Sequence, residues 1–204
     1  MNPTEGATVS SFPYPKLSAL LLDQLQPMLG MMETESIPFL KDLIATIIPT
    51  LSNPFIMADL RLAGTAVEAL RILILNAWPR IYHWRGDICA GLTDAWIRLI
   101  EDYPDIQAVD PTKVRDVEAI RVNLRETLAI TRIAAQECAD VAGQPEERQA
   151  EFKRDDKEAD FEEAEKKQQP KDETFDTALR KMLAADDRLE GLIGWVLKVE
   201  DGNA

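Results

Sequence analysis

The chain has 204 residues and a formal net charge of −13. A surface this acidic repels phosphate backbones and anionic lipid headgroups, so we expect neither nucleic acid nor membranes as partners. Apolar residues make up 46% of the sequence and aromatic residues only 6%. Since most of the apolar residues are Leu, Ile and Ala, this composition favours helices that bury a core over strands.

Targeting and redox signals are sparse. The N-terminus lacks the basic start and apolar stretch of a signal peptide, and the longest apolar runs, such as residues 72–75, are too short to span a membrane. Two cysteines, Cys89 and Cys138, are too few for a disulfide framework or a metal knuckle. We therefore expect an intracellular protein that is cytoplasmic, with the nucleus as a second compartment.

The N-terminal half predicts two helices after a proline-punctuated, extended lead-in over residues 1–16. Apolar residues recur every three or four positions over residues 17–32, where Pro27 should bend or split the first helix. Ser36 is the predicted N-cap of the second helix, and residues 52–54, Ser-Asn-Pro, are its stop.

Three further helices follow in the sequence. The third is predicted to begin near Met57 or Ala58 and to end at Pro79, and the fourth covers about 84–101. The fifth starts at Asp110-Pro111, a cap residue followed by a first-turn proline, and runs to about residue 139.

The composition then changes sharply. Residues 146–172 are dominated by charged residues and Gln, with Phe152 and Phe161 almost the only large apolar side chains. This segment is either a long exposed helix held by Glu/Lys pairs or a flexible tether. Residues 173–204 regain an apolar pattern and predict a C-terminal helical pair, in which Asp186 or Asp187 caps the last helix.

Up to residue 139, helix pairs recur at intervals of roughly forty residues, the spacing of HEAT-type repeats. We therefore predict an all-α protein in which residues 17–145 form antiparallel helix pairs stacked into an α-α superhelix. The first helix would pair with the second and the third with the fourth.

Residues for catalysis or cofactor binding are few. The only histidine is His83, and Cys89 follows six residues later, a spacing that does not reliably bring the two side chains together. There is no Gly-rich phosphate loop or dinucleotide fingerprint, and one imidazole cannot build a histidine-based metal cluster. We expect no enzyme activity, no cofactor and no metal.

One acidic cluster offers an alternative of another class. Asp186, Asp187 and Glu190 resemble the magnesium-binding sequence of helical prenyl-diphosphate enzymes. That function also needs a facing acidic group, basic residues for the diphosphate and a large apolar cavity, none of which is evident. Acidic residues at a helix start explain the cluster more simply.

The stretch 76–85, Asn-Ala-Trp-Pro-Arg-Ile-Tyr-His-Trp-Arg, concentrates residue types that anchor protein interfaces. Trp78, Pro79 and Trp84 are interpreted as a structural turn between two helices. The candidate partner-binding residues are Arg80, Tyr82, His83 and Arg85.

Residues 70–81, Leu-Arg-Ile-Leu-Ile-Leu-Asn-Ala-Trp-Pro-Arg-Ile, followed by a second leucine-rich helix, resemble the second Tel-two-interacting protein family. The resemblance covers about residues 17–135 and is most specific at residues 77–81. It implies an α-solenoid subunit of the Triple-T cochaperone complex, which works with the Hsp-ninety chaperone in maturing phosphatidylinositol-kinase-related protein kinases. Because family members are typically longer, it also implies a C-terminal portion or a shortened member.

The leading hypothesis is therefore a non-catalytic scaffold that binds other protein subunits, large helical-repeat proteins foremost, and the chaperone machinery indirectly. A generic HEAT-like adaptor in transport or trafficking is the alternative of the same class. The magnesium-dependent enzyme is the alternative of a different class.

Overall fold

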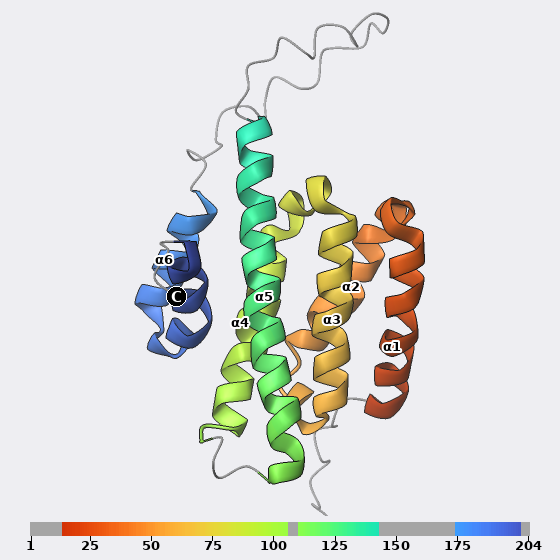
Figure 1. The fold of residues 1–204 in the computed structure, drawn as a ribbon, viewed down its shortest axis with the longest axis vertical. Helices are drawn as coiled ribbons and strands as arrows, with labels where there is room; N and C mark the ends of the chain where they lie inside the picture. Colours follow the sequence, from red (N-terminus) through yellow and green to blue (C-terminus); the bar gives the residue numbers. More distant parts are fainter. Residues whose placement is uncertain (1–13, 106–109, 143–173, 201–204) are drawn as a thin grey trace, which may run out of the picture.

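The computed structural model describes residues 14–105, 110–142 and 174–200 (Figure 1). Every regular element in these ranges is helical, which confirms the all-α prediction. The α-helices are α1 (Pro15–Met32), α2 (Leu40–Leu51), α3 (Leu60–Asn76), α4 (Arg85–Asp102), α5 (Pro111–Ala142), α6 (Phe175–Ala185) and α7 (Trp195–Glu200). Short 3₁₀ helices at Glu33–Phe39, Ile56–Ala58, Trp78–Trp84 and Asp187–Leu189, and a π-helix at Glu190–Gly194, connect them.

The first five helices form two layers. Helices α1, α3 and α5 lie side by side and run in one direction, while α2 and α4 lie behind them and run in the other (Figure 1). Helix α3 packs on α1 at one side and on α5 at the other, and α2 packs on α3 and α4. The predicted pairing is thus wrong for both pairs: the first helix lies mainly against the third instead of the second, and the third lies against the first and fifth instead of the fourth, because alternate helices share a layer.

Helix α3 is at the centre of the core because its sequence is apolar on almost every side. Its fully buried side chains include the small residues Ala63, Ala66 and Ala69, which allow neighbouring helices to approach closely. Asp59 caps it by accepting a hydrogen bond from the Leu62 amide at 3.2 Å, a cap that the sequence analysis did not assign.

Two predicted features of the N-terminal half differ in the structure. Helix α1 continues through Pro27, so the proline does not split it. Ser36 is not an N-cap: it is fully buried in the Glu33–Phe39 3₁₀ helix, where its hydroxyl donates to the Glu33 carbonyl at 2.6 Å, and α2 begins only at Leu40. Pro38 has no N–H to donate to a Ser36 cap, and the Ser36 hydroxyl is directed to the Glu33 carbonyl instead.

The predicted end of the third helix at Pro79 is wrong, since α3 ends at Asn76 and Pro79 belongs to the following 3₁₀ helix, but several other predicted ends agree with the structure. Helix α2 ends before the Ser-Asn-Pro stop, and α4 lies within one residue of its predicted ends. Asp110 accepts a hydrogen bond from the Thr112 amide at 2.9 Å at the start of α5. Asp186 accepts from the Arg188 amide at 2.9 Å, as one of the two predicted caps.

The C-terminal helices lie on the side of α5 opposite to α1 (Figure 1). Arg132 on α5, which is 5% exposed, donates to both carboxylate oxygens of Asp176 on α6 at 2.7 and 2.5 Å and to the Val196 carbonyl at 3.1 Å. Arg125 donates to the Gly191 carbonyl at 2.7 Å, and the Trp96 indole donates to the Arg188 carbonyl at 3.0 Å. Polar contacts therefore fasten this end to α4 and α5.

The predicted segments 1–13 of the lead-in and 146–172 lie outside the described residues. None of the described helices combines the length and the hydropathy that crossing a membrane requires.

Candidate protein-interaction site

The connection between α3 and α4 is the 3₁₀ helix Trp78–Trp84, which begins where α3 ends. The Ala77 carbonyl accepts hydrogen bonds from the amides of Arg80 at 2.8 Å and Ile81 at 3.1 Å. Ala77 and Ile81 are fully buried, so they anchor the turn in the core and leave Arg80 and His83 at the surface.

Both tryptophans of the turn pack against the core. Trp78 is half-buried, and its indole N–H donates to Glu137 Oε2 on α5 at 2.5 Å. Trp84 is half-buried at the start of α4. Pro79 lies in the first turn of the 3₁₀ helix. The structural role of Trp78, Pro79 and Trp84 stays a prediction.

Arg85 is held in place by the turn. Its guanidinium carbon lies 3.8 Å from the centroid of the Tyr82 ring, and its Nη1 donates to the Tyr82 carbonyl at 2.9 Å. His83 meets the rings of Tyr82 and Trp84 edge-on, with centroid distances of 6.3 and 6.1 Å. A cation fixed over an aromatic face keeps its charge while it loses rotamer freedom, so less entropy is lost when it binds an anion.

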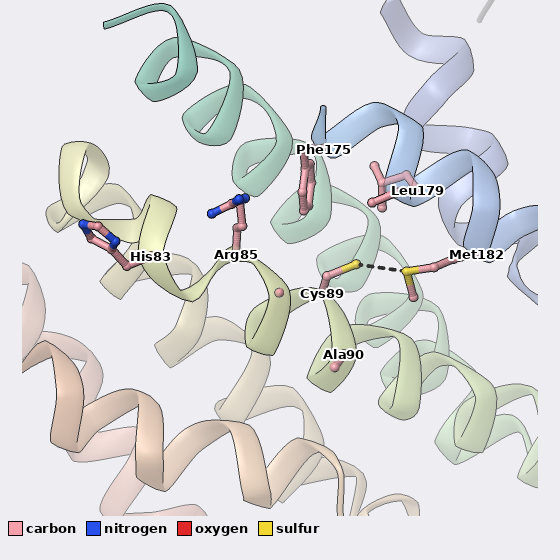
Figure 2. A pocket seen from close by; sticks show the side chains of 9 residues that line it. His83, Arg85, Cys89, Ala90, Phe175, Leu179 and Met182 are labelled. Atoms are coloured by element: carbon pink, nitrogen blue, oxygen red, sulfur yellow. Dashed lines mark hydrogen bonds between the residues drawn. The ribbon is translucent and has the colours of Figure 1, made fainter. Parts of the chain in front are cut away.

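A pocket of about 440 Å³ opens between the start of α4 and α6 (Figure 2). It is lined by His83, Arg85, Gly86, Cys89, Ala90, Phe175, Ala178, Leu179 and Met182. Figure 2 shows Arg85 and His83 toward one end and the sulfur atoms of Cys89 and Met182 toward the other. The site therefore combines apolar walls with basic and imidazole groups at one end.

The chemistry of Cys89 does not suit nucleophilic catalysis. The side chain is 4% exposed and its Sγ lies 3.8 Å from Met182 Sδ, and burial raises the pKa of the thiol to about 11. The thiol therefore stays protonated at neutral pH. In Figure 2 the imidazole of His83 is directed away from Cys89, so the two do not form a catalytic pair.

The structure brings together only some of the candidate partner-binding residues. Arg85 and His83 line the pocket, and Tyr82 supports Arg85 from beneath. Arg80 is exposed and does not line the pocket.

The α6 wall of the pocket, formed by Phe175, Leu179 and Met182, was not predicted as part of a site. The apolar pattern of residues 173–204 predicted a helical pair there, and α6 is the first helix of that segment. The sequence contains no signal for the element that this face of α6 packs against, because residues that meet across the pocket, such as Cys89 and Met182, are 93 positions apart.

The acidic cluster that suggested magnesium makes other contacts. Asp186 pairs with Arg188 Nη2 at 2.6 Å, and these side-chain hydrogen bonds lower the pKa of the Asp186 carboxyl. Glu190 pairs with Lys198 at 2.6 Å. In the part of the chain that the structure describes, no group of three or more His, Cys, Asp or Glu side chains is placed to hold a metal.

Part of the chain matches the model of a known protein family. The model of the Tti2 family matches residues 2–58. This match confirms the resemblance to the second Tel-two-interacting protein family, and it shares residues 17–58 with the predicted span, whereas residues 70–81 lie beyond it. No curated protein and no solved structure matches the chain.

Proposed function

We propose that this chain, whose residues 2–58 match the Tti2 family, is a non-catalytic protein-binding subunit of the Triple-T cochaperone complex. In that role it contributes to stabilising and assembling phosphatidylinositol-kinase-related protein kinases. Its direct partners are the other protein subunits of the complex, and it works in the cytoplasm and the nucleus.

The family match over residues 2–58 carries the proposed membership, and the pocket between α4 and α6 is the binding surface that we assign to it. Apolar side chains such as Leu179 and Met182 form its walls, and Arg85, already ordered by the Tyr82 ring, stands at one end. Pockets of this composition accept a large apolar side chain from a partner, while a fixed cation selects a neighbouring carboxylate. The site therefore fits a protein ligand with an apolar anchor and an acidic flank.

The arrangement of the helices supports the same proposal. Helices α1 to α5 alternate between two layers with short connections, as in HEAT-like repeats, and each layer can continue into a partner's helices. We infer that α1 to α5 form such an α-α superhelix, on which the C-terminal helices pack.

The test is co-expression of the chain with the other subunits of the Triple-T complex, followed by co-purification and a measured dissociation constant. Arg85→Glu reverses the fixed charge, and Ala90→Leu narrows the pocket. Each should weaken binding about tenfold, the equivalent of about 1.4 kcal/mol. Arg80→Glu measures the contribution of the exposed arginine outside the pocket.

Arg115→Glu and Ala119→Leu, which make the same changes at exposed positions of α5, are the matched controls. They should bind like the wild type. Failure of the wild-type chain to bind any subunit would refute the proposed function. Normal binding by both pocket variants would remove the pocket from the interface.

A further inference from the structure

Helix α1 is unusually poor in charge for a helix at the edge of an acidic protein. Only Lys16 and Asp23 are charged among its 18 residues, and Asp23 pairs with Arg61 at 3.3 Å. One face packs on α3 through the buried residues Ala19, Leu22 and Leu29. A helix that is apolar on all sides is normally covered on all sides.

The opposite face of α1 is apolar and exposed. Leu17, Leu21, Met28 and Met31 are 53%, 62%, 52% and 79% exposed, and Leu20 beside them is 47% exposed. We call these five residues the α1 stripe. Together they make up nearly half of the eleven large hydrophobic residues that are exposed in the described part of the chain. Such a concentration marks an interaction surface.

The spacing of the α1 stripe selects a helix as its occupant. Leu17, Leu21, Gln24, Met28 and Met31 are separated by four, three, four and three residues, the heptad spacing of helices that pack nearly parallel. Helix α1 also ends the row α5–α3–α1, in which α3 already has a helix on each side (Figure 1). A further helix along α1 would therefore continue the existing layer.

The charge of the molecule indicates a different protein as the source of that helix. Two copies of a chain with a net charge of −13 repel each other, whereas a basic partner is attracted. Glu33 and Glu35 are exposed directly after the C-terminal end of α1, so a basic residue beside the partner's stripe finds a carboxylate there. Exposed methionines adapt their shape to a partner surface.

We propose that the α1 stripe binds an amphipathic helix of another protein, with a heptad apolar stripe flanked by Lys or Arg. This inference rests on the proposed function, to which it adds a second binding surface on the side of the molecule away from the pocket. The partner helix packs along α1 in the same way that α1 packs along α3.

The direct test uses a synthetic peptide about four heptads long, with Leu at the a and d positions and Lys at the flanking positions. It is titrated into the full chain by isothermal calorimetry. The expected result is saturable binding that weakens about tenfold in the double variant Leu21→Gln/Met28→Gln. These side chains are exposed, so circular dichroism should show unchanged helix content.

Two controls distinguish specific binding at the α1 stripe from nonspecific hydrophobic binding. The double variant Val122→Gln/Ile133→Gln replaces apolar residues exposed to 45% and 42% on α5, and it should bind the peptide like the wild type. A peptide of the same composition with the heptad order scrambled should not bind. Equal binding by the stripe variant and the wild type, or no binding by the wild type, overturns the inference.

Analytical ultracentrifugation of the chain alone tests whether a second copy of the chain binds the α1 stripe. The expected result is a monomer; a wild-type dimer that the stripe variant converts to monomer would assign the stripe to a second copy and overturn the inference. Co-purification with the Triple-T subunits separates the two proposals. Normal co-purification of the stripe variant refutes the α1 stripe as the partner surface and leaves the proposed function standing. Failure of the wild-type chain to co-purify refutes the proposed function. In that case the peptide titration decides whether the α1 stripe binds a helix.

Discussion

The ion pair between Arg132 and Asp176 should be the most sensitive polar contact between the C-terminal helices and the rest of the fold. The Arg132 side chain is 6% exposed and the Asp176 side chain 27%. Asp176→Asn keeps the shape of the side chain but removes the charge, so the buried guanidinium loses its counter-ion. Breaking a buried pair in this way costs about 3–5 kcal/mol, and we expect the lower end because Asp176 is partly solvated.

The measurement is urea unfolding followed by far-ultraviolet circular dichroism, with thermal unfolding as a second probe. A loss of about 3 kcal/mol corresponds to a fall of roughly 6–12 °C in Tm for a chain of this size. Asp23→Asn is the control, because it makes the same change in the exposed pair with Arg61, whose side chains are 65% and 41% exposed. Exposed pairs contribute about 0–1 kcal/mol.

Equal losses in Asp176→Asn and Asp23→Asn would refute the reasoning that burial decides the strength of these pairs. A double variant, Arg132→Met with Asp176→Leu, gives a further check. It removes both charges, so it should recover part of the stability that Asp176→Asn loses.

Three further predictions concern the same half of the molecule. The hydrogen bonds from Arg132 lower the pKa of Asp176 in the folded state, so this carboxylate stabilises the fold above its ordinary pKa of about 3.9. That contribution is lost as pH falls through the folded pKa. The difference in unfolding free energy between wild type and Asp176→Asn should therefore shrink toward low pH, which urea unfolding at a series of pH values measures. Gly191→Ala places a Cβ 2.6 Å from Trp96 Cζ2 and should lower stability by about 1–3 kcal/mol in thermal unfolding. Gly194→Ala meets only the end of the Glu190 side chain, which is 54% exposed and can turn away, so it should cost less. Equal losses would contradict the packing argument. In a Cys138→Ser background, a pKa of about 11 keeps Cys89 almost fully protonated, so a thiol reagent at pH 8 should label it slowly in the folded state and rapidly in urea.

The helix ends were predictable where the signal is local. Asp110-Pro111 at the start of α5 and the Ser-Asn-Pro stop after α2 act through the backbone of the residues beside them, so a sequence pattern is sufficient. Ser36 misled the prediction because its hydroxyl bonds to the Glu33 carbonyl within a 3₁₀ helix, and Pro38 removes one of the two amides from which a cap there could accept.

The candidate site was predictable only in part, for a related reason. Tyr82 and Arg85 are three residues apart, so their contact follows from local spacing. The opposite wall, with Phe175 and Met182, depends on how α6 packs against α4. Arg132 and Arg125 on α5 bind the C-terminal helices through partners forty or more residues away, and no local pattern reveals such partners.

The position of the pocket between α4 and α6 links ligand binding to the attachment of the C-terminal end. A ligand there touches Arg85 on one wall and Phe175 on the other, so it holds the two together in addition to filling the space. By thermodynamic reciprocity, if docking of α6 raises the affinity for the ligand by some factor, the bound ligand raises the docking equilibrium of α6 by the same factor. The contact between Arg132 and Asp176 is therefore also a control on affinity, although neither residue reaches the bound molecule.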